Sequence, residues 1–536
     1  MTTMTTTDRP LDIDALTMEA VRGGTLEDVP VAVLGAARSG IGLSRFLAGA
    51  GARVTLYDGR PAAELRPAIE ALSGELASGR VVLAVGPDVD PATVLEGSSL
   101  VATSPSINPD FPTTEPRLQA ALRSMVAALA GGDPAAPALV SEADLFLRLC
   151  PAPTIGVTGT KGKTTTSSLI AALLAADPGH PVELGGNIGR PLVEILPALT
   201  PEHRVVIELS ELQLPTLSRG TTVAVYTNVT SDHLDRHGSL AAYRRVKRRL
   251  AELVDPAGGL VLNDDDQVVA GYGGAAARIV RYRLGTPHAG SLGIEDGWIV
   301  AAGLEPLGPP FADGLAVSGP ILPIAELAIP GAHNVSNAMA AVAAALLFGI
   351  DPDAIRRAAA GFLGVEHRLE LVATLDGVRF VNDSQGTQPD AVIAALRAFD
   401  PPIVLIAGGR DKDVDLSGLP PVVAERVSAA VLIGESGPTL GAMFRAAGLE
   451  RTESAPSLES AVERAAALAR ESLTRAPAGT VATVLLSPAA ASFDMFVDYA
   501  ARGLAFKAAV ADLAAGRPAS PDRPSASTAD RPEERR

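Results

Sequence analysis

The chain is almost free of cysteine, since Cys150 is the only one among its 536 residues. One thiol cannot form a disulfide framework, and chains without disulfides are typical of reducing compartments. The sequence therefore predicts a cytoplasmic protein.

Long apolar runs are also missing. No stretch of about 18 uncharged apolar residues occurs, so no membrane-spanning helix is expected. The opening segment MTTMTTTDRPLDIDALTMEAVRGG lacks a basic region followed by an apolar one, so no secretory signal is expected.

Positive charge is in deficit, because 45 Lys and Arg face 61 Asp and Glu and leave a net charge of -16. A nucleic-acid-binding domain needs a basic face, so the composition argues against that class of protein. The composition does not exclude a positively charged pocket inside an acidic surface.

The composition that is present, 47% hydrophobic and 20% charged, is typical of soluble globular proteins. A chain of 536 residues is too long for one core, and about 150 residues per domain predicts three or four domains.

The first globular segment, VPVAVLGAARSGIGLSRFLAGAGARVTLYDGRP, has the pattern strand, glycine turn, helix, strand. This pattern predicts a βαβ unit of the nucleotide-binding kind, closed by Asp58. Gly35, Gly40 and Gly42 follow G-x4-G-x-G and not G-x-G-x-x-G, so a dinucleotide site is not predicted.

Two more α/β blocks follow, one from Thr154 with a β-rich region at about 271–330, and one from Glu366. We therefore expect an α/β protein of three domains in series: Rossmann-like, central P-loop α/β, and Rossmann-like. The expected segments are a polar N-terminal extension at 1–28, domains at 29–150, 151–365 and 366–514, and a disordered tail at 515–536.

The segment TIGVTGTKGKTTTSSLI predicts a phosphate-binding loop between a strand at 154–157 and a helix at 165–176. Its glycines let backbone N–H groups turn toward an anion at a helix N-terminus. Lys163 would reach phosphates and Thr164 would bind Mg²⁺. The strict motif requires glycine where Val157 stands, so a glycine-rich turn with a surface lysine is the alternative.

Acidic and basic side chains follow the next strands, in VVIELSELQL and VYTNVTSDHLDRHGSLAAYRRVKRRL. Glu208, at a strand end, is placed for Mg²⁺, and His233 could bind or orient a metal. The alternatives are a solvated strand end for Glu208 and a capping or surface histidine for His233. Spacing alone would put Lys247 on a solvated helix face.

Seven segments in this order resemble the Mur ligases: GTKGKTT, ELSELQL, NVTSDHLDRHG, GAHNVSNAMAA, EHRLE, VNDSQGT and LLSPAAASFD. The resemblance runs from about Val29 to Val510. EHRLE together with LLSPAAASFD favours the member of the family that adds glutamate to UDP-N-acetylmuramoyl-L-alanine, in peptidoglycan precursor synthesis. The resemblance implies that ATP first converts the alanyl carboxylate to an acyl phosphate, which the amine of glutamate then attacks.

The resemblance also implies roles for individual residues. Lys163, His233 and Lys247 would be catalytic, and Lys247 would be carbamylated. ATP would contact Gly159, Thr160, Lys161, Gly162, Lys163, Thr164, Thr165, Asn334, Asn337, Arg368 and Asp383. Two Mg²⁺ ions would be held by Thr164, Glu208, His233 and carbamylated Lys247.

The same resemblance assigns the two other substrates. The UDP-muramoyl substrate would contact Ser39, Asp58, Arg60 and Asn187. Glutamate would contact Thr387, Lys412, Ser492, Phe493 and Tyr499, which supply the cation and hydroxyl donors that a buried dicarboxylate requires. A monomer is expected.

The segment NDSQGT departs from the family pattern N-D-S-K-A-T, because Gln385 replaces a lysine. A related group that adds L-glutamate also lacks this lysine, whereas Lys412 favours D-glutamate. Other open interpretations are folylpolyglutamate synthase, a catalytically silent protein that binds nucleotide or precursor, and a P-loop kinase or NTPase. The last leaves HNVSN and LLSPAAASFD unexplained.

Overall fold

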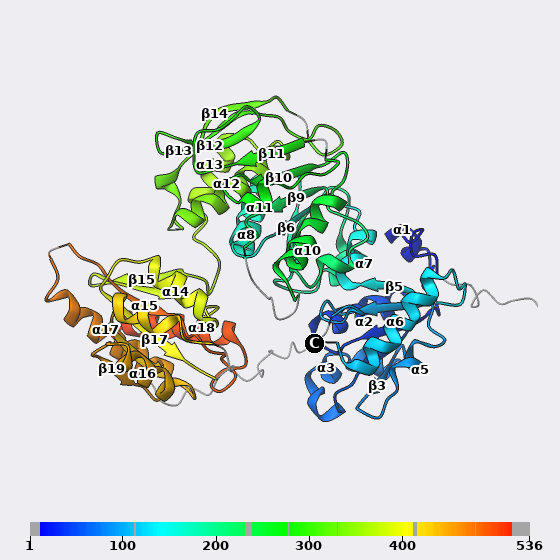
Figure 1. Ribbon diagram of the computed structural model, residues 1–536, viewed down its shortest axis with the longest axis horizontal. Helices are drawn as coiled ribbons and strands as arrows, with labels where there is room; N and C mark the ends of the chain where they lie inside the picture. Colours follow the sequence, from blue (N-terminus) through cyan, green and yellow to red (C-terminus); the bar gives the residue numbers. More distant parts are fainter. Residues whose placement is uncertain are drawn as a thin grey trace, which may run out of the picture. The chain divides into compact units, whose positions relative to one another are not determined.

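The computed structural model describes residues 11–111, 114–230, 238–276, 278–312, 314–329, 331–410, 415–477 and 479–516 (Figure 1). The chain forms two compact units. The first unit comprises Met1–Leu327 and Ala332–Phe362, and the second comprises Ala328–Gly331 and Leu363–Arg536. The first unit contains two sheets and the second unit contains one.

The N-terminal sheet is parallel and has the strand order β3-β2-β1-β4-β5. Its strands are β1 (Pro30–Leu34), β2 (Arg53–Asp58), β3 (Val81–Val85), β4 (Leu100–Thr103) and β5 (Ala138–Ser141). Its helices are α1 (Met18–Arg22), α2 (Arg38–Gly49), α3 (Arg66–Ala71), α4 (Ser73–Ala77), α5 (Pro91–Leu95) and α6 (Pro116–Ala130). Apolar residues of β1 face α2 on one side and α6 on the other, so both faces of the sheet are covered.

The central sheet has nine strands in the order β14-β13-β12-β11-β10-β9-β6-β8-β7. The strands are β6 (Thr154–Thr158), β7 (Val182–Gly186), β8 (Arg204–Glu208), β9 (Val223–Tyr226), β10 (Gly259–Asn263), β11 (Arg278–Tyr282), β12 (Ser291–Glu295), β13 (Trp298–Leu304) and β14 (Val317–Pro323). Strands β6 to β12 are parallel, and β13 and β14 are antiparallel additions, which confirms the expected β-rich region.

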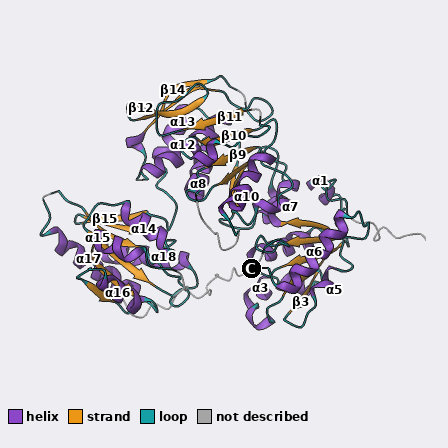
Figure 2. Ribbon diagram, viewed as in Figure 1, coloured by secondary structure: helices purple, strands orange, loops and turns teal. Residues whose placement is uncertain are grey.

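Helices cover both faces of the central sheet (Figure 2). They are α7 (Glu142–Leu149), α8 (Lys163–Leu174), α10 (Leu240–Leu253), α11 (Gln267–Ala270), α12 (Ala332–Leu347) and α13 (Pro352–Ala360). The small side chains of α12 allow close packing, and every residue from Ala338 to Leu347 is buried in one core with α8. Helices α7 and α10 belong to the other core.

The second unit has six strands in the order β15-β16-β20-β17-β18-β19, with only β15 antiparallel among the described strands. The strands are β15 (Glu370–Leu375), β16 (Val378–Asn382), β17 (Ile403–Gly408), β18 (Val427–Ile433), β19 (Thr452–Ser454) and β20 (Ala482–Leu486). One face carries α17 (Leu458–Leu473) and α18 (Tyr499–Ala514), and the other carries α14 (Pro389–Arg397), α15 (Leu419–Arg426) and α16 (Gly437–Ala446). The predicted fold class, three α/β sheets in series, is confirmed.

The described part of the expected N-terminal extension contributes to a core. Leu16 and Leu26 are buried together with residues of β1 and α2. Arg148 on α7 donates to Asp14 Oδ1 at 2.6 Å and to the carbonyl of Ile13 at 3.1 Å. Beyond residue 516, the predicted tail lies outside the described residues. No described helix is long and apolar enough to cross a membrane.

Candidate active site

The phosphate-binding loop joins β6 to α8, which begins at Lys163 and so two residues before the predicted start. Gly162 has φ +85° and lies against α12, where an added Cβ would be 2.4 Å from Asn337 Oδ1. Gly159 has φ +153°, and a Cβ there would be 1.9 Å from Thr227 Oγ1. Both positions therefore require glycine, through backbone conformation and through space.

The loop is held by side chains of the turn that follows the neighbouring strand β9. Asn228 accepts the N–H of Lys161 at 2.9 Å and donates to the carbonyl of Lys161 at 3.0 Å. Thr227 also donates to that carbonyl at 2.6 Å. Lys163 curls over the loop, and its Nζ donates to the carbonyls of Gly159 at 3.2 Å and Thr160 at 2.9 Å. Hydrogen bonds from Thr227, Asn228 and Lys163 thus fix the backbone of the loop.

Glu208 connects two other residues that the sequence assigned to the site, Thr164 and Asn187. Its carboxylate is almost fully buried at the end of β8, so it is not a solvated strand end. Thr164 Oγ1 donates to Oε2 at 2.7 Å, and Asn187 Nδ2 donates to Oε1 at 2.8 Å. Carboxylate, hydroxyl and amide oxygens are the donors that Mg²⁺ prefers, so this set fits the ion.

The other expected metal ligands are His233 and, if carbamylated, Lys247, and His233 lies outside the described residues. Within the described residues no group of three or more His, Cys, Asp or Glu side chains is arranged for a metal. The fit to Mg²⁺ therefore depends on Glu208 and Thr164.

Lys247 lies on the buried face of α10, so the solvated-face alternative for this residue is wrong. Its Nζ donates to the carbonyl of Gly159 at 2.9 Å and to Thr158 Oγ1 at 3.3 Å. One turn earlier, the hydroxyl of Tyr243 is 3.0 Å from Thr160 Oγ1. Sequence reasoning missed Tyr243, although its i, i+4 spacing from Lys247 puts both on one helix face.

The asparagines predicted for the nucleotide lie in the first two turns of α12, and both are buried. Asn337 Nδ2 donates to Asn334 Oδ1 at 3.1 Å. Since Asn337 Oδ1 faces Gly162, the structure brings this pair to the phosphate-binding loop.

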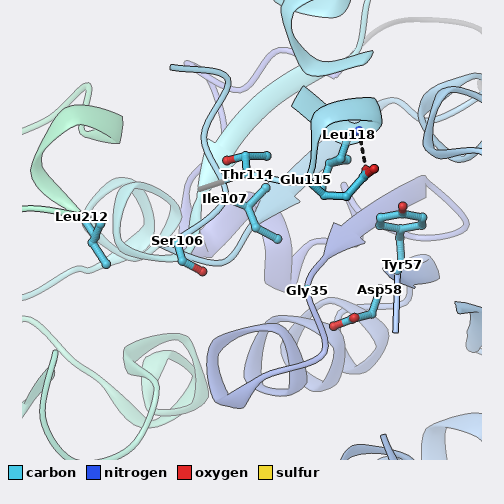
Figure 3. Close-up of a pocket in the computed structure, with 10 residues that line it drawn as sticks. Gly35, Tyr57, Asp58, Ser106, Ile107, Thr114, Glu115, Leu118 and Leu212 are labelled. Atoms are coloured by element: carbon cyan, nitrogen blue, oxygen red, sulfur yellow. Dashed lines mark hydrogen bonds between the residues drawn. The ribbon is translucent and has the colours of Figure 1, made fainter. Parts of the chain in front are cut away.

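A cavity of about 300 Å³ opens at the carboxyl edge of the N-terminal sheet (Figure 3). Its lining residues end or follow β2, follow β1 and β4, lie at or just before the start of α6, or belong to the central domain: Gly35, Tyr57, Asp58, Gly59, Ser106, Ile107, Thr114, Glu115, Leu118 and Leu212. The strand order reverses between β1 and β4, and such switch points are where open α/β sheets bind ligands.

Asp58 is anchored at this cavity by an amide and a guanidinium. It accepts the N–H of Ala36 at 2.9 Å, and Arg60 donates to it through Nε at 3.0 Å and Nη2 at 2.8 Å. Burial raises the pKa of Asp58, but these hydrogen bonds outweigh burial and leave the pKa below its usual value. Ser39 lies in the first turn of α2.

In the second unit, Arg368 sits in a turn between two residues with left-handed backbone, His367 at φ +63° and Leu369 at φ +46°. Asp383 accepts the N–H of Leu369 at 3.3 Å and the hydroxyl of Ser487 at 2.6 Å. Burial raises the pKa of Asp383 to about 7. The structure thus brings together the two residues predicted to contact ATP from this unit.

Glu370, missed by sequence reasoning, holds the same turn. Its Oε2 accepts the N–H of His367 at 2.9 Å and Nδ2 of Asn382 at 3.0 Å. Its Oε1 accepts Nζ of Lys507 at 2.7 Å. These bonds stabilise a backbone conformation that costs about 1–3 kcal/mol per residue.

The described residues among those predicted to bind glutamate lie on two loops and at the first residue of α18 in the second unit. Ser492 is buried, whereas Phe493 is 62% and Tyr499 is 44% exposed. Thr387 follows Gln385, whose carbonyl accepts the N–H of Thr387 at 2.7 Å. Lys412 lies outside the described residues.

A buried arginine that the sequence did not reveal connects these two loops. Arg502 donates to Ser384 Oγ at 3.0 Å and to the carbonyl of Ser384 at 2.9 Å. It also donates to the carbonyls of Ala490 and Ala491, each at 3.3 Å. Burial lowers the pKa of its guanidinium to about 10, so it remains charged at neutral pH.

Comparisons with known proteins place these features in one family. A model of the Mur ligase middle domain matches residues 157–345, and a model of the Mur ligase glutamate ligase domain matches residues 367–490. A UDP-N-acetylmuramoylalanine--D-glutamate ligase of Symbiobacterium thermophilum is 38% identical over 487 residues, which cover 90% of this chain and 98% of the relative. The protein of the same name from Geobacter metallireducens is also 38% identical, over 91% of this chain and 98% of the relative.

Among solved structures, a UDP-N-acetylmuramate-alanine ligase from Thermotoga maritima is 18% identical, with a TM-score of 0.49 over 91% of this chain and all of that chain. The curated relatives and the two domain models lead to the same result. The chain belongs to the Mur ligase family.

Proposed function

We propose that this protein is an ATP-dependent ligase that adds D-glutamate to UDP-N-acetylmuramoyl-L-alanine in peptidoglycan precursor synthesis. The observation that carries the proposal is Glu208, whose carboxylate joins Thr164 of the phosphate-binding loop to Asn187. This arrangement supports a nucleotide site next to Asn187, which is expected to contact the muramoyl substrate. The names of the relatives support the choice of substrate and of D-glutamate.

The loop from Gly159 to Thr165 would bind the ATP phosphates through its N–H groups and Lys163. Asn334 and Asn337 would support it from α12, and Arg368 and Asp383 would supply further nucleotide contacts. The acyl phosphate would form when an oxygen of the alanyl carboxylate attacks the γ-phosphorus of ATP. ADP leaves in that step, and inorganic phosphate leaves when the amine of glutamate closes the amide.

Magnesium, when bound, would neutralise negative charge on the phosphoryl oxygens. Thr164 and Glu208 would hold it, together with His233. We propose a second ion for which carbamylated Lys247 provides a ligand, since carbamylation would turn a buried cation beside the loop into an anion. The buried position of Lys247 next to Gly159 supports this role.

The cavity beside Asp58 would receive the uridine part of the substrate, with Ser39 and Arg60 nearby. Glutamate would be bound by Thr387, Lys412, Ser492, Phe493 and Tyr499. Gln385 would then be a tolerated replacement of the family's lysine. We expect the protein to act as a monomer in the cytoplasm and propose domain boundaries near residues 28, 150, 365 and 514.

The test is phosphate release from ATP in the presence of UDP-N-acetylmuramoyl-L-alanine, with D-glutamate and L-glutamate in parallel. Release that requires D-glutamate and disappears in Lys163→Ala supports the proposal. Release with L-glutamate alone would replace D-glutamate by its enantiomer. No release with either amino acid would overturn the ligase assignment for this chain.

A further inference from the structure

The cavity at the N-terminal sheet contains a buried phenol. The side chain of Tyr57 is 2% exposed, and its ring packs in a core with residues of α6. Within the described part of the protein, its hydroxyl has no hydrogen-bond partner. Leaving such a hydroxyl unsatisfied costs about 1–3 kcal/mol, so its retention calls for a partner from outside the chain.

The hydroxyl is covered, but it lies beside the cavity. Tyr57 and Gly59 both line the cavity, and a Cβ on Gly59 would be 3.7 Å from the Tyr57 oxygen. Figure 3 shows Tyr57, Glu115 and Leu118 grouped on one side of the cavity, with Ser106 and Ile107 across from them. The phenol therefore belongs both to the core with α6 and to the wall of the cavity.

Other polar groups of that wall are already engaged. Thr114 Oγ1 donates to the carbonyl of Asn108 at 2.8 Å and accepts its N–H at 3.2 Å. The two carboxylate oxygens of Glu115 accept the N–H groups of Arg117 at 3.1 Å and Leu118 at 2.8 Å. Tyr57 has no comparable engagement, which leaves its O–H ready to donate.

The lining favours a flat, neutral ligand group. It combines the Tyr57 ring with Ile107 and Leu118 and includes no lysine or arginine. Arg60 and Arg117 lie nearby but are paired with Asp58 and Glu115, so a phosphate would find no unpaired cation in the lining. A heterocycle with carbonyl oxygens would gain apolar walls and a hydrogen-bond donor. The neighbouring Asp58 is at the position where such folds contact a ribose.

We propose that the Tyr57 hydroxyl donates a hydrogen bond to a carbonyl oxygen of the pyrimidine ring of the UDP-linked substrate. This inference rests on the proposed function, and it adds a substrate-binding residue that the motifs do not contain. A neutral hydrogen bond contributes about 0.5–1.5 kcal/mol, which corresponds to a roughly 2- to 12-fold change in affinity.

The experiment compares wild type with Tyr57→Phe, a change that keeps the ring and removes only the hydroxyl. Two probes are titrated by calorimetry: UDP, and ribose 5-diphosphate, which lacks the base. The variant should bind UDP several-fold more weakly and ribose 5-diphosphate as well as wild type does. In turnover, only the KM for UDP-N-acetylmuramoyl-L-alanine should rise, with kcat and the KM values for ATP and glutamate unchanged.

The stability of the variant separates binding from structure. Because the hydroxyl has no partner within the described protein, Tyr57→Phe should not lower the unfolding midpoint. Tyr282→Phe is the matched control, since the Tyr282 hydroxyl donates to the carbonyl of Tyr226 at 2.9 Å in the central domain. That variant should be less stable than wild type but bind UDP normally.

Several results would overturn the inference. Equal UDP affinity in wild type and Tyr57→Phe would mean that the hydroxyl only binds water. Equal losses for UDP and ribose 5-diphosphate would mean that it does not contact the base. Either result overturns only this inference, provided that wild type converts UDP-N-acetylmuramoyl-L-alanine. A wild-type protein that neither binds UDP nor converts UDP-N-acetylmuramoyl-L-alanine would contradict the proposed function.

Discussion

Thr164 and Asn187 donate to opposite oxygens of one buried carboxylate, at 2.7 Å and 2.8 Å from Glu208. Thr164 belongs to the first turn of α8, and Asn187 follows β7. Since β7 and β8 are adjacent parallel strands, their carboxyl ends meet at the same edge as the phosphate-binding loop. One side chain thus couples the nucleotide loop to a loop assigned to the other substrate.

Glu208→Gln should therefore remove activity without unfolding the protein. The amide keeps the shape and one acceptor oxygen but loses the charge that favours Mg²⁺. We expect kcat to fall by about two to three orders of magnitude, as when one charged group of an active site is removed. The Mg²⁺ concentration for half-maximal phosphate release should also rise.

Glu295→Gln is the control, because Glu295 is exposed at the end of β12. It should behave as wild type at every Mg²⁺ concentration. A Glu208→Gln enzyme with the Mg²⁺ dependence of wild type would remove Glu208 from the metal site.

Lys247 gives a second prediction. Lys247→Ala removes a buried amine that donates to the carbonyl of Gly159. The phosphate-binding loop therefore loses a hydrogen bond and the charged group beside it. Turnover should fall at least 100-fold, and a small carboxylate such as acetate should restore part of it if a carbamate normally supplies the anion. The measurement is phosphate release over a range of acetate concentrations.

The neighbouring Arg248→Ala tests whether the effect is specific to the buried position. The Arg248 side chain is 53% exposed and pairs with Glu252 on the same helix. Such surface pairs contribute at most about 1 kcal/mol, so activity should be unchanged. If acetate leaves Lys247→Ala as inactive as before, carbamylation loses its support.

The sequence predicted the fold class and the phosphate-binding loop because both depend on local patterns. Alternating strands and helices predict parallel sheets, and closely spaced glycines before Lys163 predict an anion site. The start of α8 was placed two residues late because a glycine-rich loop gives no sharp helix signal before its first helical turn.

Other parts of the site depend on contacts between distant segments. Arg502 and Ser384 are separated by 118 residues, and nothing local marks Arg502 as buried. Glu370 is four residues from Glu366, yet only the packing of α18 brings Lys507 to both carboxylates. Tyr57 belongs to an ordinary strand. Only the folded structure shows that its hydroxyl has no partner and that the residue lines a cavity.

Gly162→Ala should weaken nucleotide binding and lower stability. The new Cβ would be 2.4 Å from Asn337 Oδ1 at a backbone φ of +85°, so the loop or Asn337 must move. We expect a loss of about 1–3 kcal/mol in unfolding free energy, and a KM for ATP raised by a factor of ten or more.

Gly74→Ala is the control, and it should change stability in the opposite direction. Both variants are measured by urea unfolding and by ATP kinetics. Gly74 lies in helix α4 with no atom within 4 Å of an added Cβ. Alanine there should raise stability by up to about 1 kcal/mol and leave kinetics unchanged. Normal ATP kinetics in Gly162→Ala would show that the loop does not need its left-handed glycine.

Glu142 predicts a pH dependence of stability. This carboxyl group on α7 is 2% exposed and accepts the N–H of Val193 at 3.2 Å. Burial raises its pKa from 4.5 to about 7, so the folded protein keeps a proton that the unfolded chain releases near pH 4.5. Its contribution to stability is complete below pH 4.5 and is lost as the pH rises through 7, which amounts to about 3 kcal/mol.

Glu142→Gln removes this titration and keeps an acceptor for Val193, so the variant should gain stability relative to wild type as the pH increases. The measurement is urea unfolding of both proteins between pH 5 and pH 8.5, where we expect the difference in unfolding free energy to shift by up to about 3 kcal/mol in favour of the variant. Glu70→Gln, at an exposed position on α3, should show a difference that stays constant across the same range. A constant difference for Glu142→Gln as well would mean that Glu142 ionises at the same pH in the folded and unfolded protein, and that the hydrogen bonds from the segment at Leu192 and Val193 offset its burial.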